Sequence, residues 1–85
     1  MSFEEIKQQL VEENSEALLA DGFDEALIGI ARRCSQPSLA VYSREKCIEI
    51  LAKEMGEDAE EYFEFNVSGS WNGENTPIFL WQPEF

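Results

Sequence analysis

Hydrophobic residues at helical spacing near the N-terminus predict a first helix. Ser2 followed by Glu5 forms a capping box, a start signal in which the two side chains satisfy free backbone amides. The apolar residues that follow share one face of this helix, and the face consists of Phe3, Ile6, Leu10, Ala17 and Leu18, with Val11 at its flank. Because Asp21-Gly22 is a turn signal, we expect the helix to end near Leu19 or Ala20.

Two short apolar runs after this helix predict a β-hairpin. Residues 26–34 (ALIGIARRC) and 39–42 (LAVY) contain β-branched or aromatic residues, and the intervening residues 35–38 (SQPS) are typical of a turn. An alternative is that Leu27 and Ile28 belong to a short helix with Asp24 as its N-cap.

The segment after the hairpin predicts a second helix with defined ends. Ser43 is its N-cap candidate, and Glu45 lies in the first turn, where the helix dipole favours an acid. Gly56 occupies the place of a C-terminal glycine. Between these ends the apolar residues repeat at helical spacing, and they are Ile48, Leu51, Ala52 and Met55, with Cys47 beside them.

Residues 57–71 carry two conflicting patterns. Apolar and polar residues alternate from 63 to 71, which is typical of a strand that turns at Asn72-Gly73. Helical spacing also fits, and the acidic run 57–61 is a poor strand former. We favour a helix that continues to about Asn66 or Val67, followed by an irregular segment.

Residues 76–81 (TPIFLW) predict the last strand, with Pro77 at its start or on a sheet edge. The predicted fold is therefore a single small α+β domain spanning residues 1–85. Its elements follow in the order α-β-β-α-α-β, and we expect an antiparallel three-stranded sheet packed by helices.

Composition and charge narrow the classes of function. The 85 residues are 44% hydrophobic, and a chain of this size buries roughly 60–65% of its unfolded surface, enough for one modest core. Eighteen acids against six bases give a net charge of −12, which disfavours direct binding to nucleic acid because phosphates are repelled. With no long apolar run and no signal-peptide pattern, we expect a soluble cytoplasmic protein that does not bind membranes.

The charges are segregated along the chain. Residues 1–25 carry −7, residues 26–53 carry +3 and residues 54–85 carry −8. One interpretation is that the weakly basic centre pairs with the acidic ends in the fold. Another is that the acidic ends dock onto a basic surface of another protein, including one that normally holds nucleic acid.

The residues needed for most catalytic and metal sites are missing. The chain has no histidine, and Cys34 and Cys47, the only cysteines, match no zinc spacing. We expect both cysteines to be buried as small hydrophobic residues. Neither a calcium loop nor a phosphate-binding loop fits the sequence, so we expect no enzyme activity, no metal and no cofactor.

Four aromatic residues gather in the C-terminal stretch: Trp71, Phe79, Trp81 and Phe85. Tryptophan is a common anchor in protein interfaces. For Trp71 a core position and an interface position are both open, whereas we expect Trp81 to lie in the core.

Four segments in this order resemble a family of small uncharacterised proteins from tailed phages, prophages and some bacteria. They are ALLADGFDEALIG (17–29), AVYSREKCIEIL (40–51), EEYFEFNV (60–67) and GENTPIF (73–79), and the resemblance covers about residues 17–80. It implies a helix over 57–67 and a mixed α/β fold, and it implies no particular activity. The chain departs from the family pattern at 53–58 (KEMGED), where relatives have a longer lead-in to the third helix.

We therefore expect a small, acidic, non-enzymatic interaction protein, similar to a phage accessory protein, that binds and modulates a host or viral protein. It would act in the host cytoplasm if a phage encodes it, and its partner would be basic or normally bind nucleic acid. Trp71 is the expected anchor. The acids expected to steer the encounter are Glu57, Asp58, Glu60, Glu61 and Glu64.

Two alternatives belong to other classes of protein. The first is a small ligand-binding or enzymatic subunit with a pocket near Asn66, Trp71 and Glu74, where polar groups lie among aromatic residues. The second is a self-associating structural component in which the strand at 76–81 pairs across a dimer axis. A monomer and a homodimer are both compatible with the sequence.

Overall fold

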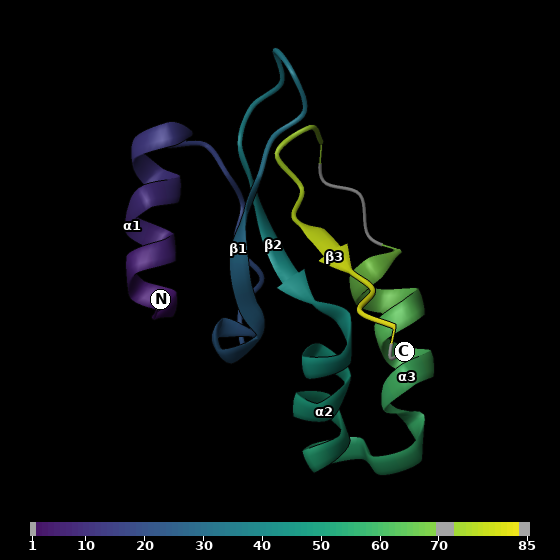
Figure 1. Cartoon of the computed structure of the whole chain (residues 1–85). Coiled ribbons are helices and arrows are strands. Elements are labelled where there is room, and N and C mark those ends of the chain that lie inside the picture. Colours follow the sequence, from purple (N-terminus) through teal and green to yellow (C-terminus); the bar gives the residue numbers. More distant parts are fainter. Residues whose placement is uncertain (1, 70–72, 84–85) are drawn as a thin grey trace.

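The computed structural model of the chain describes residues 2–69 and 73–83. Its regular elements are α1 (Phe3–Glu13), β1 (Leu27–Ala31), β2 (Leu39–Ser43), α2 (Arg44–Met55), α3 (Ala59–Tyr62) and β3 (Ile78–Leu80) (Figure 1). Short 3₁₀ turns precede β1 (Asp24–Ala26) and α3 (Gly56–Asp58), and a π-helical segment (Phe63–Ser68) continues α3. The α+β class and the order α-β-β-α-α-β are confirmed.

The three strands form one sheet in the order β1-β2-β3. The predicted hairpin is confirmed, because β1 and β2 pair antiparallel with Leu27 opposite Tyr42 and Ala31 opposite Leu39. The prediction that β3 is also antiparallel is wrong: β3 runs parallel to β2, with Tyr42 opposite Phe79. The reason is that α2 carries the chain away from the end of β2 and α3 brings it back, so β3 repeats the direction of β2 (Figure 1).

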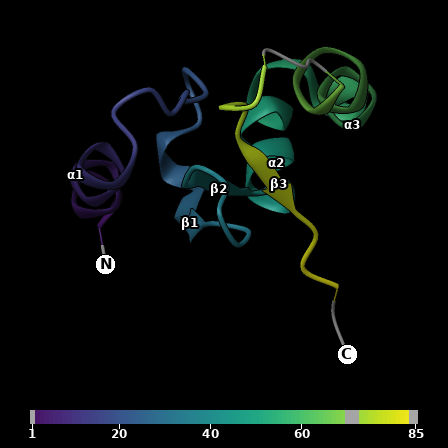
Figure 2. The same ribbon diagram turned by 90° about the horizontal axis from the view of Figure 1, so that it is seen from above.

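One face of the sheet packs into a single hydrophobic core with residues of α1, α2 and α3. Alternate residues of β2, Ala40 and Tyr42, are fully buried on this face. Tyr42 and Phe63 each contact the ring of Phe79, at centroid distances of 5.8 and 5.2 Å. Seen from above, α1 lies at the β1 side of the sheet, and α2 and α3 lie toward β3 (Figure 2).

The first helix is shorter than predicted. It ends at Glu13, so Ala17 and Leu18 lie in the connection to β1 and not on the helix. Asn14 stops the helix because its backbone is extended and its side-chain amide donates to the Ser38 carbonyl and to Asn75 Oδ1, both at 2.9 Å. The N-cap half of the capping box is confirmed, since Ser2 Oγ accepts a hydrogen bond from the Glu5 amide, whereas the Glu5 carboxylate accepts from the Ser2 hydroxyl and not from a backbone amide.

The second and third helices follow the sequence signals closely. Ser43 Oγ caps α2 by accepting from the Lys46 amide at 3.3 Å, and Gly56 ends it with φ +59°. The helical alternative for 57–67 is confirmed and the strand alternative is wrong for residues 63–69, while its remaining part, with the turn at Asn72-Gly73, falls largely outside the described residues. The alternative in which Leu27 and Ile28 belong to a short helix is wrong, because both residues lie in β1. Within residues 2–69 and 73–83 no helix is long and apolar enough to cross a membrane.

The two cysteines lie in different environments. Cys47 is fully buried in α2, as expected. The expectation for Cys34 is wrong: it is exposed, because β1 ends at Ala31 and Cys34 lies in the hairpin loop beside Ser35, whose φ is +66°. The two thiols are free.

Candidate protein-interaction site

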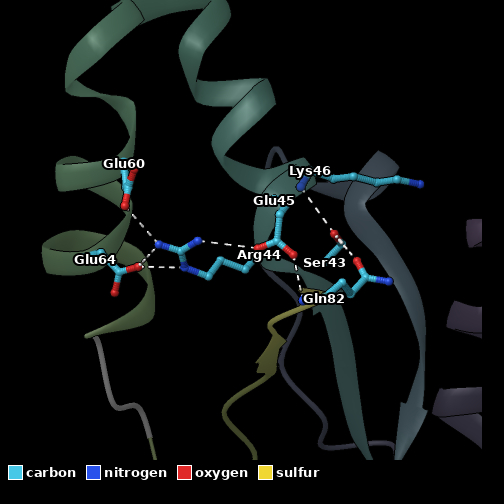
Figure 3. A network of polar contacts seen from close by, with 7 residues as sticks. All are labelled: Ser43, Arg44, Glu45, Lys46, Glu60, Glu64 and Gln82. Atoms are coloured by element: carbon cyan, nitrogen blue, oxygen red, sulfur yellow. Dashed lines mark hydrogen bonds and ion pairs between the residues drawn. The ribbon is translucent and has the colours of Figure 1, made fainter. Parts of the chain in front are cut away.

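Arg44, the first residue of α2, joins α2 to α3 through its side chain. Its Nε and Nη2 both lie 2.8 Å from Glu64 Oε1, and Nη2 also lies 3.3 Å from Glu60 Oε1 (Figure 3). Nη1 lies 3.5 Å from Glu45 Oε2. Only 11% of the side chain is exposed, and a guanidinium can be held at such a position because each edge of its planar fork meets a carboxylate.

The charge of Arg44 is stable in this environment. Burial lowers the pKa of Arg44, but the hydrogen bond and charge of Glu64, with further hydrogen bonds from Glu45 and Glu60, outweigh burial and raise that pKa above its ordinary value. The guanidinium therefore stays positive at any pH at which the protein is folded, and it can hold an electron-rich ring against its free face.

Trp81 occupies that free face. The Arg44 guanidinium carbon lies 3.9 Å from the centroid of the Trp81 ring, which is close cation–π geometry. The expectation that Trp81 lies in the core is wrong, because 64% of the residue is exposed. Its strand ends at Leu80, so Trp81 follows the sheet rather than belonging to it.

The residue after Trp81 fixes the C-terminal segment against α2. The Gln82 amide donates to Glu45 Oε1 at 2.8 Å, and its side-chain Oε1 accepts from Ser43 Oγ at 2.7 Å (Figure 3). One hydrogen bond from its backbone and one to its side chain thus hold Gln82, the residue immediately beyond Trp81. The indole is presented to solvent by a rigid support rather than by a free chain end.

The five acids predicted to steer a partner lie on α3, the turn before it and the segment after it, and they divide into two groups. Glu60 and Glu64 pair with Arg44. Glu57, Asp58 and Glu61 are exposed and take part in no ion pair among the described residues. The negative potential of this surface therefore comes mainly from the second group.

Phe65 is the most exposed large hydrophobic residue in the described part of the chain, at 76%. It lies four residues after Glu61 in continuous helical backbone, so the two side chains leave the helix in neighbouring directions. We call the surface formed by these residues the α3 face, and it comprises Glu57, Asp58, Glu60, Glu61, Glu64, Phe65 and Trp81.

The remaining predicted site residues do not come together. Trp71 lies outside the described residues. Asn66 lines a hollow of about 500 Å³ with Phe23 and Phe79. Glu74 lines a different hollow, of about 560 Å³, with Arg32 and Arg33 at the hairpin loop.

Cys47, the acidic side chains and Arg44 are the reactive or charged groups to consider in the described residues. Burial, the larger cause, and the charge of Glu45 raise the pKa of the Cys47 thiol to about 12, so it stays protonated and unreactive near neutral pH. Among residues 2–69 and 73–83 no three histidine, cysteine or acidic side chains are grouped so that they could hold a metal ion. Each guanidinium nitrogen of Arg44 already donates to one of the protein's own carboxylates.

No protein-family model matches the chain. No curated protein and no solved structure matches it either.

Sequence reasoning located the acids of the α3 face but missed Arg44, Phe65 and Trp81 as parts of it. Arg44 and Glu64 are 20 residues apart, and only the antiparallel packing of α2 and α3 joins them. A usable signal for Trp81 was its position at the end of the short apolar run that follows Pro77, because an aromatic residue beyond a strand end is not held to the core face.

Proposed function

We propose that this chain is a small, acidic, non-enzymatic interaction protein that binds and modulates a host or viral protein through the α3 face, as a phage accessory protein would. The observation that carries the proposal is the placement of Trp81. Its ring rests on the Arg44 guanidinium at 3.9 Å and is still 64% exposed. A large aromatic side chain fixed in advance loses little conformational freedom on binding, which makes it an effective anchor.

Charge determines the kind of partner that fits this surface. The chain carries −12 overall, and the unpaired acids Glu57, Asp58 and Glu61 precede the exposed Phe65 on one continuous helical segment. A basic protein surface is attracted to this field, and one that normally holds nucleic acid is the natural match. Association should therefore be fast at low salt and slow down as salt is added.

The proposal is tested with variants in an association assay. A partner is first captured from the natural host lysate at low salt, and its association rate is then measured by surface plasmon resonance across a salt series. Neutralising Glu57, Asp58 and Glu61 to the corresponding amides should slow association and flatten its salt dependence. The matched control neutralises three exposed acids at the end of α1 and just beyond it, Glu12, Glu13 and Glu16.

Anchoring is measured separately from steering. Trp81→Ala should speed dissociation about tenfold or more, because truncating an interface anchor costs on the order of 2 kcal/mol. Val11→Ala is the control, since Val11 is 57% exposed and lies on α1. Equal effects of the α3-face variants and their controls on rate, salt dependence and dissociation would contradict the proposal.

Self-association is a second candidate, because β3 is an edge strand of the sheet. Its residues Ile78 and Leu80 are 38% and 42% exposed, so the strand offers both unpaired backbone groups and apolar side chains to a second copy. Sedimentation velocity over a concentration series distinguishes the candidates: a dimer that Ile78→Lys disrupts supports self-association, and a monomer at all concentrations excludes it.

A further inference from the structure

A groove lies between the connection that precedes β1 and the helical segment that follows α2. It consists of two hollows, of about 500 and 270 Å³, which share Asp21, Phe23 and Val67 in their walls. The first hollow extends past Asn66 to Phe79, and the second extends past Tyr62 to Glu54. This groove plays no part in the Arg44 network.

The walls of the groove are apolar and partly open to solvent. Leu18 and Leu19 are 39% and 40% exposed and Tyr62 is 42% exposed, while Phe23 and Phe79 lie deeper. The two hollows between these side chains have room for one or two large apolar side chains from another molecule.

The charges at the groove have one sign. Asp21 and Glu54 are the charged side chains among the described residues that line the two hollows. By contrast, the hollow beside the hairpin loop is lined by Arg32 and Arg33 together with Glu74. The groove therefore combines an apolar interior with an acidic rim, in a chain whose overall charge is −12.

We propose that this groove receives the apolar side chains of a basic, amphipathic helix of the protein partner. The inference rests on the proposed function and specifies which part of the partner is bound. Apolar side chains on one face of such a helix fill the groove, and lysine or arginine residues beside them meet Asp21 and Glu54. An acidic or phosphorylated segment is excluded by the same rim and by the net charge.

The test uses a probe peptide and isotope-labelled protein. The probe is a synthetic amphipathic helix of leucine and lysine, and its control peptide has alanine in place of each leucine, so the charge is the same. Backbone amide shifts are followed by NMR during titration. We expect saturable shifts at groove residues with the leucine peptide and much weaker binding of the alanine peptide.

Variants of the protein locate the binding site. Leu18→Ser with Leu19→Ser should weaken binding of the leucine peptide about tenfold or more, since each side chain covers considerable apolar area on binding. Val11→Ser, at an exposed aliphatic residue of α1, should leave binding within about twofold. The amide spectrum of each free variant shows that it is folded, so loss of binding is not loss of structure.

Two results would overturn the inference, and they differ in what they say about the α3 face. Equal binding of both peptides, or none, shows that the groove does not select apolar side chains. Binding that survives the leucine double variant but is lost in Trp81→Ala places the peptide on the α3 face, which overturns the groove and supports the proposed function. Failure of the proposed function itself is seen only in the partner assay.

Discussion

Replacing Arg44 by alanine tests how the α3 face is held together. Within residues 2–69 and 73–83, the guanidinium is the one cation that pairs with Glu45, Glu60 and Glu64, and it supports the Trp81 ring. Its removal leaves three carboxylates close together without a counter-charge. We therefore expect a loss of stability and, in addition, a loss of order in the segment that carries Trp81.

The size of the loss follows from the geometry. The short contacts to Glu64, at 2.8 Å to a 40% exposed side chain, are charge-assisted hydrogen bonds worth about 2 kcal/mol together. The longer contact to Glu60, which is 70% exposed, adds well under about 1 kcal/mol. Stacking on Trp81 adds roughly 0.5–1 kcal/mol. The total is about 3 kcal/mol, or a fall in Tm of about 12–24 °C for a domain of this size.

Urea unfolding followed by circular dichroism measures this loss. Lys46→Ala is the matched control: it removes the same charge from the same turn of α2, and the Lys46 amino group makes no ion pair with the described residues (Figure 3). Arg44→Lys should fall between the two, because an ammonium keeps the charge but cannot bridge two carboxylates with a planar fork. If Arg44→Ala costs no more than Lys46→Ala, within about 0.5 kcal/mol, the network does not stabilise the fold.

Three further predictions concern the core and one turn. Burial raises the pKa of the Cys47 thiol to about 12, so the native state keeps a proton that the unfolded chain releases near its ordinary pKa of about 8.5. The free energy of unfolding should therefore fall as pH rises from about 9 toward 12 in urea titrations, and an unchanged slope in Cys47→Ala would refute this assignment. In native protein an aromatic disulfide reagent should modify Cys34 rapidly and Cys47 only on unfolding, so two fast thiols would be inconsistent with the structure. Gly56→Ala should cost about 1–2 kcal/mol because φ is +59°, whereas Gly29→Ala, at a site with open space and no positive φ, should be nearly neutral; equal costs in urea unfolding would argue against backbone strain.

The features that sequence predicts well in this chain are those determined by neighbouring residues. Ser43 and Gly56 mark the ends of α2 because a cap and a positive-φ glycine act within one turn. The end of α1 is different. Asn14 stops that helix through hydrogen bonds to Ser38 and Asn75, which lie far along the chain. No pattern in the neighbouring sequence predicts these bonds.

The same distinction applies to the α3 face. A run of acids is visible in the sequence, but which of them stay unpaired depends on where Arg44 lies after α2 and α3 have packed. The direction of β3 is also non-local, because the alternation of Ile78, Phe79 and Leu80 is the same in parallel and antiparallel strands. The alternation of apolar and polar residues predicts that this segment is a strand, but the path of α2 and α3 determines that the strand pairs parallel to β2.

The parallel pairing of β2 with β3 has a consequence for the kinetics of folding. The β1–β2 hairpin closes a short loop, whereas β3 reaches β2 through a long crossover that contains α2 and the helical segment beyond it. Contacts that close long loops tend to form late, after the transition state. Weakening β3 should therefore accelerate unfolding far more than it slows folding, and Trp81, which follows β3, would be among the first residues released.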